Sequence, residues 1–548
     1  MWKNHPKALP FLFFSEMWER FGYYLMIGIF TLYLKDVKTG YGMTEAESAD
    51  LYGTFIALVF FTPFLGGLIA DRYLGYRKSI IIGGLMMGVG YCLMAVHDIT
   101  TLYISMTLVI AGNGFFKPNI STLLGNVYST PVYKAQKDEG YNIFYMGINI
   151  GAFICNFFGA ALYVMMGWSY AFIAAGIGMF IGVLVFLTGT KHYTAFDIKK
   201  SAQPTDMPFT RIVLLILLPS VIFGAAGWLL PGLMWNTALF GSSSTDAFIF
   251  ACLPVIYFYT SLYATAAKEE KRPILALLAI FAVVILFWAV FKQNGSALNT
   301  WADRYTNREV KGAPEKVFET LRFSQQIAYT KDSVPLYDEQ FRLQKEDGKI
   351  IRTYDYSSYF KNIKPESLPQ PGSSISVWAT NLSQSMNPGW VIIFTPLILA
   401  FFTWLRKRNR EPSTATKITW GLFISALSAL VMVGAVYASN NGAEKASTWW
   451  LIASYGVITV GELFLSPMGL SIVSKLSPAR ITALMMGGWF LSTSIGNKLS
   501  GVLATMWDDY DHKANYFWLN FALLIAAAAA CFAMLRWLNT ILKERGIN

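Results

Sequence analysis

The chain has 548 residues, of which 54% are hydrophobic and 14% charged, and its mean hydropathy is +0.42. A soluble globular chain carries about a quarter charged residues, so this composition argues against a soluble domain and indicates a membrane protein. The net charge of +11 would suit a nucleic-acid-binding protein. The basic residues lie in loops between apolar segments, however, which accounts for the charge without nucleic acid.

The cysteines and histidines give no sign of a metal site, and we expect no cofactor. The four histidines are scattered, and the four cysteines have neither CxxC nor Cys/His spacing. The first apolar stretch is interrupted by charged residues and lacks a cleavage site, so we expect it to remain attached rather than to be removed as a signal peptide. The cysteines, expected to be core residues, are Cys92, Cys155, Cys252 and Cys531.

Apolar runs of about 20 residues predict membrane-spanning helices. The chain contains about fourteen such runs. In chain order they are residues 9–34, 50–70, 78–96, 101–122, 141–164, 169–190, 209–231, 246–267, 273–297, 388–405, 417–439, 448–468, 481–506 and 515–541.

Lysines and arginines gather in every second loop of this series, which places these loops and both termini on one side. The positive-inside rule assigns that side to the cytoplasm. The basic stretches are WKNHPK at the start, residues 71–78, 133–137, 191–200, 268–272, 406–410 and 474–480, and KERG near the end.

Two segments stand out from the regular pattern. Residues 306–372 are polar and predict a small extracytoplasmic subdomain or ordered cap, and residues 209–267 add two further helices. Without them the chain divides into six plus six helices, the architecture of a major-facilitator transporter. We therefore predict an all-α membrane protein with two six-helix bundles, residues 1–190 and 273–548, and two extra helices within residues 191–272.

The stretch SEMWERFGYY, residues 15–24, places charged groups inside the first predicted helix. Glu16, Glu19, Arg20 and Tyr23 follow the spacing i, i+3, i+4, i+7, which puts them on one stripe, and Tyr24 flanks it. An ionisable group in the bilayer costs about 2.5–3.5 kcal/mol on insertion scales. The stripe should therefore face a watery cavity, or Glu16 and Arg20 should satisfy each other.

Other charged residues also fall within predicted helices. Lys117 precedes Pro118, which kinks a helix and can turn the lysine towards a cavity. Glu462 lies in the middle of its helix, whereas Lys292 lies towards the outer end and could instead reach the membrane surface. Three carboxylates thus face three cations, so one added proton or zwitterion would perturb the balance. The six residues are Glu16, Glu19, Glu462, Arg20, Lys117 and Lys292.

Several motifs resemble the proton-coupled oligopeptide transporter (POT/PTR) family of the major facilitator superfamily. SEMWERFGYY is similar to the ExxERFxYY signature of the first helix, and GGLIADRYLGYRK, residues 66–78, resembles a conserved cytoplasmic loop. The stretches FFKPNIST, FYMGINIGAF, SQSMNP and GELFLSPMGLS resemble further parts of the family. The resemblance spans nearly the whole chain except residues 306–372 and implies proton-driven uptake of di- and tripeptides by a monomer in the inner membrane.

The resemblance also implies roles for individual residues. Glu16, Glu19 and Arg20, together with Glu462, would couple protons. Lys117 would hold the carboxylate of the peptide, or pair with Glu462 when the site is empty, and Glu462 would receive the amino terminus. The expected pocket residues are Tyr23, Tyr24, Lys117, Asn149, Lys292, Asn387, Glu462 and Trp489, and the conformational loop contains Asp71, Arg72 and Arg77.

Three positions depart from the family pattern. Ile27 replaces an arginine, Lys292 replaces a glutamate, and Phe60 replaces a tyrosine that often contacts substrate. In the family, that arginine and that glutamate can form a salt bridge across the outer gate, and both are missing here. We therefore expect either that Lys292 pairs with Glu462 or Glu16, or that it adds a second anion site.

Other classes of function are less compatible with the sequence. An ATP-driven pump would need a GxxxxGK[ST] phosphate loop, which is absent. A membrane enzyme would need a His/Asp or metal constellation, and none is found, so we predict that the chain is not an enzyme. The alternatives are proton-coupled transport of another small zwitterion or anion, such as an amino acid, a peptide-like metabolite or nitrate, and a non-transporting membrane receptor.

Overall fold

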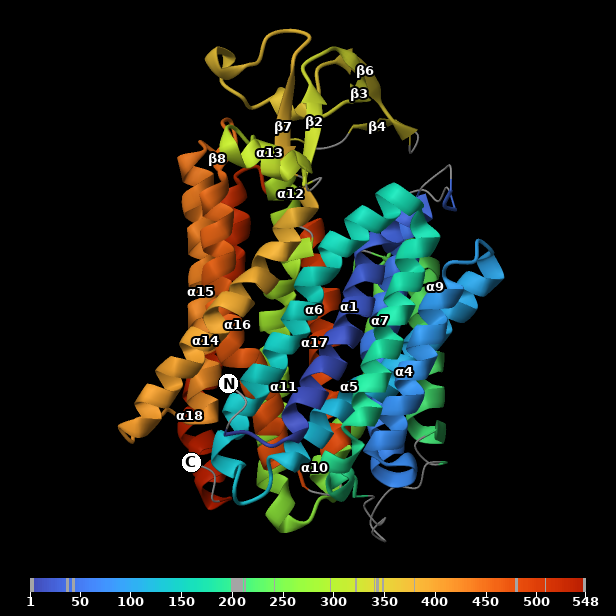
Figure 1. The fold of residues 1–548 in the computed structure, drawn as a ribbon, viewed down its shortest axis with the longest axis vertical. Helices are drawn as coiled ribbons and strands as arrows, with labels where there is room; N and C mark the ends of the chain where they lie inside the picture. Colours follow the sequence, from blue (N-terminus) through green and yellow to red (C-terminus); the bar gives the residue numbers. More distant parts are fainter. Residues whose placement is uncertain are drawn as a thin grey trace.

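The structure is a computed structural model, and it places helices along most of the chain (Figure 1). The described residues are 4–35, 39–41, 45–198, 210, 213–240, 242–295, 297–320, 323–339, 341, 344–346, 349–378, 380–478, 481–507 and 509–545.

All fourteen predicted helices coincide with helical backbone in the described ranges, and nine helices there are long and apolar enough to cross a membrane. The first half of the chain contains α1 (Ala8–Lys35), α2 (Glu45–Phe61), α3 (Pro63–Ile69), α4 (Tyr76–Leu93), α5 (Ile99–Val127), α6 (Lys137–Met166) and α7 (Trp168–Thr188). The extra pair is α9 (Leu218–Trp235), preceded by a π-helical turn at Val213–Leu217, and α10 (Ser243–Thr265). The second half contains α11 (Lys268–Phe291), α12 (Ala297–Arg304), α13 (Ala313–Thr320), α14 (Ser383–Lys407), α15 (Thr414–Ala438), α16 (Thr448–Leu476), α17 (Thr482–Thr505) and α18 (Lys513–Glu544).

The predicted helix over residues 273–297 ends earlier than expected. The α-helical backbone of α11 stops at Phe291, and a 3-10 turn, Lys292–Gly295, follows it before α12 begins. Asn294 and Gly295 are residues of low helical propensity, which favours a turn at this place. The consequence for function is that Lys292 lies at the junction of α11 and the turn rather than within a continuous helix.

The helices pack in two groups that lie side by side in Figure 1. In the first, α1 packs against α6 and α7, and α4 packs against α5 and α7. In the second, α15 packs against α16 and α18, and α11 packs against α17 and α18. The groups meet where α6 contacts α14 and α16 and where α17 contacts α2, α3 and α5. Where the predicted domain boundaries fall along the chain stays a prediction.

Small residues allow neighbouring helices to approach closely. A Cβ added to Gly66 in α3 would lie 1.8 Å from the carbonyl oxygen of Gly114 in α5. Similarly, a Cβ at Gly461 in α16 would lie 2.1 Å from the Ser425 hydroxyl in α15. Such contacts are typical of helices packed within a membrane, where small residues let backbones touch.

Residues 306–378, here named the cap, form short paired strands at one end of the helices (Figure 1). The opposite end holds both chain termini and is named the terminal end. Two antiparallel pairs dominate the cap: β2 (Ser324–Ala328) with β7 (Ser374–Trp378), and β3 (Asp332–Pro335) with β6 (Arg352–Asp355). A smaller pair joins β4 (Lys345–Glu346) to β5 (Lys349–Ile350), and β1 (Thr306–Asn307) pairs in parallel with β8 (Ala446–Ser447), which ties the cap to the loop before α16.

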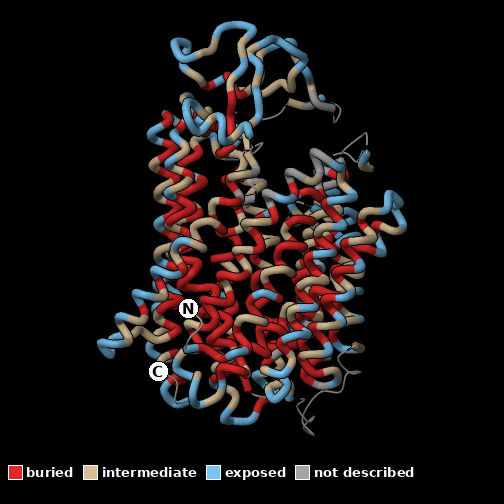
Figure 2. The backbone as a smooth tube through the Cα atoms, in the orientation of Figure 1, coloured by how far each residue is buried: buried red, intermediate tan, exposed pale blue. Residues whose placement is uncertain are grey.

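Buried residues concentrate along the inner faces of both helix groups, as Figure 2 shows. The outer faces instead expose large apolar side chains, for example Leu233 at 79% and Tyr257 at 73% on the extra helix pair. Exposed apolar surface on this scale suits a chain surrounded by lipid. The polar residues buried inside the helices are therefore the unusual groups, and they form the candidate site.

Candidate functional site

The predicted stripe on α1 forms one compact buried cluster. The Arg20 guanidinium donates to both carboxylate oxygens of Glu19, and its Nε lies 3.8 Å from Oε1 of Glu16. All three side chains are at most 2% exposed. The second oxygen of Glu16 makes no hydrogen bond within the described ranges. Two carboxylates thus share one cation, which binds Glu19 in the two-pronged geometry typical of arginine and touches Glu16 more loosely.

Two tyrosines extend this cluster along α1. The Arg20 Cζ lies 4.6 Å from the ring centre of Tyr23 and 6.0 Å from that of Tyr24, and the two rings meet edge to face. Tyr23 is buried, whereas Tyr24 is partly exposed. The aromatic faces favour the guanidinium. Because Tyr24 is partly exposed, it is the residue of this group best placed to meet a ligand.

Glu462 on α16 is held by neutral donors instead of by a cation. The Tyr145 hydroxyl on α6 donates to its Oε1, and the Asn387 amide on α14 donates to its Oε2 at 2.7 Å. Asn387 also donates to the Thr459 hydroxyl at 2.9 Å. The side chain of Glu462 is 2% exposed. The donors come from both halves of the chain, so this carboxylate connects the two helix groups.

Tyr145 was not among the predicted site residues. It lies in FYMGIN, four residues before Asn149, and the resemblance of this stretch to the family does not single out the tyrosine. The amide of Asn149 donates to the Tyr145 carbonyl oxygen at 2.9 Å within the same helix. Asn149 is therefore placed beside the Glu462 site without contacting the carboxylate in this arrangement.

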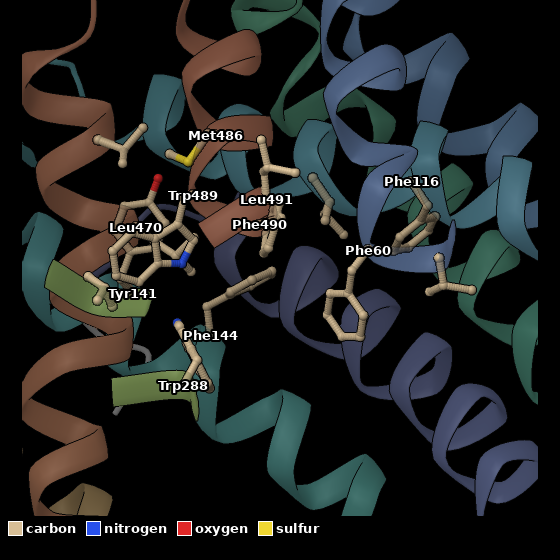
Figure 3. Close-up of a cluster of buried hydrophobic side chains, with 14 of the residues drawn as sticks. Phe60, Phe116, Tyr141, Phe144, Trp288, Leu470, Met486, Trp489, Phe490 and Leu491 are labelled. Atoms are coloured by element: carbon tan, nitrogen blue, oxygen red, sulfur yellow. The ribbon is translucent and has the colours of Figure 1, made fainter. Parts of the chain in front are cut away.

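Lys117 on α5 lies between aromatic rings from the two halves. Its ammonium is 4.4 Å from the ring centre of Phe60 on α2 and 4.9 Å from that of Phe490 on α17. Both rings belong to the buried cluster drawn in Figure 3. The expected pairing of Lys117 with Glu462 is not formed in this structure, in which Tyr145 and Asn387 donate to the two carboxylate oxygens.

Lys292 follows the last residue of α11 and has a similar aromatic environment. Its ammonium lies 5.8 Å from the ring centre of Trp288 and 5.9 Å from that of Phe291. The side chain is partly exposed, as is that of Lys117. Neither lysine makes an ion pair with a residue that the structure describes. The expected pairing of Lys292 with Glu462 or Glu16 is therefore also not formed here.

Trp489, predicted to line the pocket, packs against α16 in this structure. It is 2% exposed, and a Cβ added to Gly469 would lie 1.9 Å from its ring. Its ring also meets Phe281 edge to face at 6.4 Å, and Figure 3 shows it among buried apolar side chains. Because Gly469 has no side chain, the indole of Trp489 fits against α16. The sequence of α16 alone does not show that a glycine is needed there.

The predicted conformational loop links the two halves at the terminal end. Asp71 accepts a hydrogen bond from the Tyr76 hydroxyl at 2.7 Å and another from the backbone N–H of Leu484, near the start of α17, at 3.2 Å. Asp197 accepts from the backbone N–H groups of Tyr76 at 2.7 Å and Arg77 at 3.3 Å. Arg72 was also predicted for this loop, and its side chain lies outside the part of the chain that the structure describes.

A second polar junction at the terminal end was missed by the sequence analysis. Asp138, at the start of α6, accepts from Lys417 at 3.2 Å, from Lys475 at 2.7 Å and from the Ser471 hydroxyl. Lys417 also pairs with Glu411 at 2.7 Å. We name these five residues the latch. Nothing local in the sequence indicates it, because Asp138 and Lys417 are 279 residues apart.

A neighbouring ion pair supports the latch. Arg406 contacts Glu139 at 3.3 Å and Glu411 at 2.6 Å. Burial of Glu411 disfavours its charged form, but Arg406 and Lys417 hold the pKa of this carboxyl below its ordinary value. Glu411 is therefore charged around neutral pH, and the latch joins the two helix groups at the terminal end.

Comparisons with known proteins agree with this architecture. A family model described as PTR2, POT family, matches residues 77–321 and 374–519. The chain is 28% identical over 513 residues to the uncharacterized transporter YclF of Bacillus subtilis, covering 92% of this chain and 89% of that protein. It is 28% identical over 506 residues to the dipeptide and tripeptide permease A of Escherichia coli, covering 92% and 85%.

Solved structures show the same fold. A crystal structure of peptide transporter POT in complex with sulfate superposes with a TM-score of 0.65 at 25% identity, covering 99% of this chain and 96% of that one. A mutant of a peptide transporter POT in complex with alafosfalin gives a TM-score of 0.64 at 25% identity, with the same coverage. From the matched family model and these likenesses, the chain belongs to the POT family.

Proposed function

We propose that this multi-pass membrane protein takes up di- and tripeptides together with protons by alternating access. The observation that carries the proposal is the placement of opposite charges on the two helix groups, with Lys117 on α5 and Glu462 on α16. A peptide is a zwitterion whose two backbone ends carry opposite charges. One molecule can therefore interact with both groups, and its binding can favour one arrangement of the two groups over another.

The relatives support peptides as the substrate class. The dipeptide and tripeptide permease A of Escherichia coli aligns along 92% of this chain. The aromatic rings around Lys117 and the partly exposed Tyr24 provide apolar surface beside the charges. Apolar walls with a few placed polar groups tolerate different side chains while fixing the backbone, which suits transport of many peptides.

The α1 cluster supports proton coupling, and Glu16 is its most suitable proton carrier. Glu19 is bound to Arg20 by two hydrogen bonds, so protonating it would disrupt that interaction. Glu16 has only a 3.8 Å contact with Arg20 and one oxygen without a partner among the described residues. A proton can therefore bind Glu16 and leave the Glu19–Arg20 pair intact. The proton gradient would supply the energy.

The orientation follows from the charge pattern of the loops. With both termini in the cytoplasm, the latch lies at the cytoplasmic end and the cap lies outside. The arrangement is then closed towards the cytoplasm by the latch and by Asp71, and release of substrate inside requires both contacts to break. We place the protein in the inner membrane and expect a monomer.

Uptake of labelled dialanine into proteoliposomes, with and without an inward proton gradient, tests this function. Gradient-driven uptake should be lost in Glu16→Gln while counterflow exchange of dialanine remains. Glu462→Ala should lose both, because it removes the group that receives the peptide amino terminus. Counterflow without any response of the parent protein to the gradient would contradict proton coupling. No dialanine exchange by folded protein would contradict peptide transport and favour another small zwitterion or anion.

A further inference from the structure

We propose that Lys292 is a second anion-binding residue that makes this transporter prefer peptides with a carboxylate side chain. The proposal rests on the peptide transport proposed above and adds the substrate class. Lys292 is a specificity-determining residue in this view, while Lys117 and Glu462 recognise the peptide backbone.

Two cations between the helix groups, Lys117 and Lys292, are available to bind an anion. Glu19 and Glu16 both lie beside Arg20, and Glu462 is bound by Tyr145 and Asn387. No carboxylate of the described residues pairs with Lys117 or Lys292. Both ammonium groups are instead held near aromatic rings and are partly exposed. They are therefore the cations that an incoming anion can reach.

The ammonium of Lys292 lies beside the buried ring of Trp288. Trp288 belongs to the same buried cluster as Phe490, the ring beside Lys117, and Figure 3 shows both rings. The adjacent Gln293 is 2% exposed and is anchored to α18, where it exchanges hydrogen bonds of 3.1 Å with Asn520. This anchor fixes the turn after α11, so the position of Lys292 is set by the fold and does not depend on a flexible loop.

A neutral dipeptide satisfies only one of the two lysines. Its amino terminus can neutralise Glu462 and its terminal carboxylate can neutralise one ammonium, which leaves the other without a counter-ion. A peptide with an aspartate or glutamate side chain carries a second carboxylate. Such a peptide can therefore bring a carboxylate to both ammonium groups.

Proton coupling strengthens the same preference. Three cations, Arg20, Lys117 and Lys292, balance three carboxylates, Glu16, Glu19 and Glu462, when all are charged. Binding one proton to a carboxylate leaves these six groups with a net charge of +1, since three positive charges then face two negative ones. A peptide with a net charge of −1 restores neutrality, whereas a neutral peptide does not. The protonated carrier therefore matches an acidic peptide.

Competition for labelled dialanine in counterflow tests the inference at a fixed pH near 7. The competitors are Ala-Glu and Ala-Gln, which are nearly equal in size and differ by one charge. We expect Ala-Glu to compete about tenfold more strongly, the order of magnitude for one charge pair away from bulk water. The preference should disappear in Lys292→Gln and remain in Lys292→Arg, and thermal melting in detergent should show that both variants are folded.

The outcomes separate the two proposals. Equal competition by Ala-Glu and Ala-Gln in the parent protein, with dialanine exchanged, would overturn the role of Lys292 and leave peptide transport standing. A preference that survives in Lys292→Gln would also overturn it, because another residue would then recognise the side chain. Absence of exchange with dialanine, together with absence of Ala-Glu uptake, would overturn the proposed function itself.

Discussion

The two carboxylate sites inside the helices are built in opposite ways. On α1, Glu16 and Glu19 share the cation of Arg20 on the same helix. On α16, Glu462 is held only by the neutral donors Tyr145 and Asn387, which come from different halves of the chain. Both sites are buried, so the difference lies in their partners and not in their access to water.

This difference separates two tasks. Because the α1 cluster draws its partners from one helix, a change in its proton content need not depend on how the two helix groups lie. Glu462 takes hydrogen bonds from α6 and α14, so relative movement of the groups changes its surroundings directly. We infer that α1 binds the proton and that Glu462 on α16 responds to relative movement of the two helix groups. The following predictions test that division.

Arg20→Gln should have the largest effect, because it leaves two buried carboxylates without their cation. Removing one partner of a buried ion pair costs about 3–5 kcal/mol. We expect a marked fall in thermal stability in detergent and loss of uptake. Arg20→Lys, which keeps the charge without the two-pronged geometry, should fall between the parent and Arg20→Gln. An Arg20→Gln protein that melts like the parent would show that the cluster is not held by this cation.

Asp138→Asn should open the terminal end, because Lys417 and Lys475 lose their shared counter-ion. Truncating one partner of a buried charge pair costs about 2–5 kcal/mol, here at the expense of the closed arrangement. Spin labels at the exposed Val132 and Arg408 should report longer distances across this end. The control is Glu544→Gln, because the ion pair of Glu544 with Arg272 joins two helices of the second half and its loss should leave the distances nearly unchanged.

Tyr145→Phe should weaken peptide binding without unfolding the protein. The substitution removes one hydrogen bond to the Glu462 carboxylate and keeps the ring. A hydrogen bond to a charged group contributes about 1.5–3 kcal/mol, so KM for dialanine should rise about tenfold or more. Tyr141→Phe is the control, because that hydroxyl donates to the Ser121 carbonyl oxygen within the first half. Equal effects of the two substitutions would argue against a special role for Tyr145.

Local patterns in the sequence predicted the helices and the α1 cluster. Apolar runs of membrane-spanning length identify helices directly, and the spacing of Glu16, Glu19, Arg20 and Tyr23 places them on one stripe. Both inferences need only neighbouring residues. The motifs also identified the family, because the signature residues occur close together in the chain.

Contacts between distant residues could not be read from the sequence. Tyr145 and Glu462 are 317 residues apart, and Asp138 and Lys475 are 337 apart. Which residues meet depends on how the two helix groups pack, as the burial of Trp489 against Gly469 also shows. A lysine was therefore expected opposite Glu462, where a tyrosine and an asparagine are found. The transport roles of the site residues stay predictions.

The smallest expected effect concerns the attachment of the cap. Lys445, in the loop before α16, donates to the Arg304 carbonyl oxygen at 3.1 Å and lies 4.1 Å from the ring centre of Tyr359. Burial and the nearby Arg308 lower the pKa of Lys445 from 10.5 to about 7, while Asp303 acts in the opposite direction. Lys445 therefore binds a proton more readily when the cap is detached than when it is attached.

The sign of the pH effect follows from that difference. The attachment of the cap should be strongest above pH 10.5 and should weaken as the pH falls towards 7. Below pH 7, Lys445 should cause no further change. Solvent screening at the edge of the cap limits the change to about threefold in the rate of amide exchange of the cap. Lys445→Met should remove this dependence between pH 7 and 9.5, since it keeps the apolar stem without the charge. A parent protein whose cap exchanges at a rate independent of Lys445 would show that the proton does not control attachment.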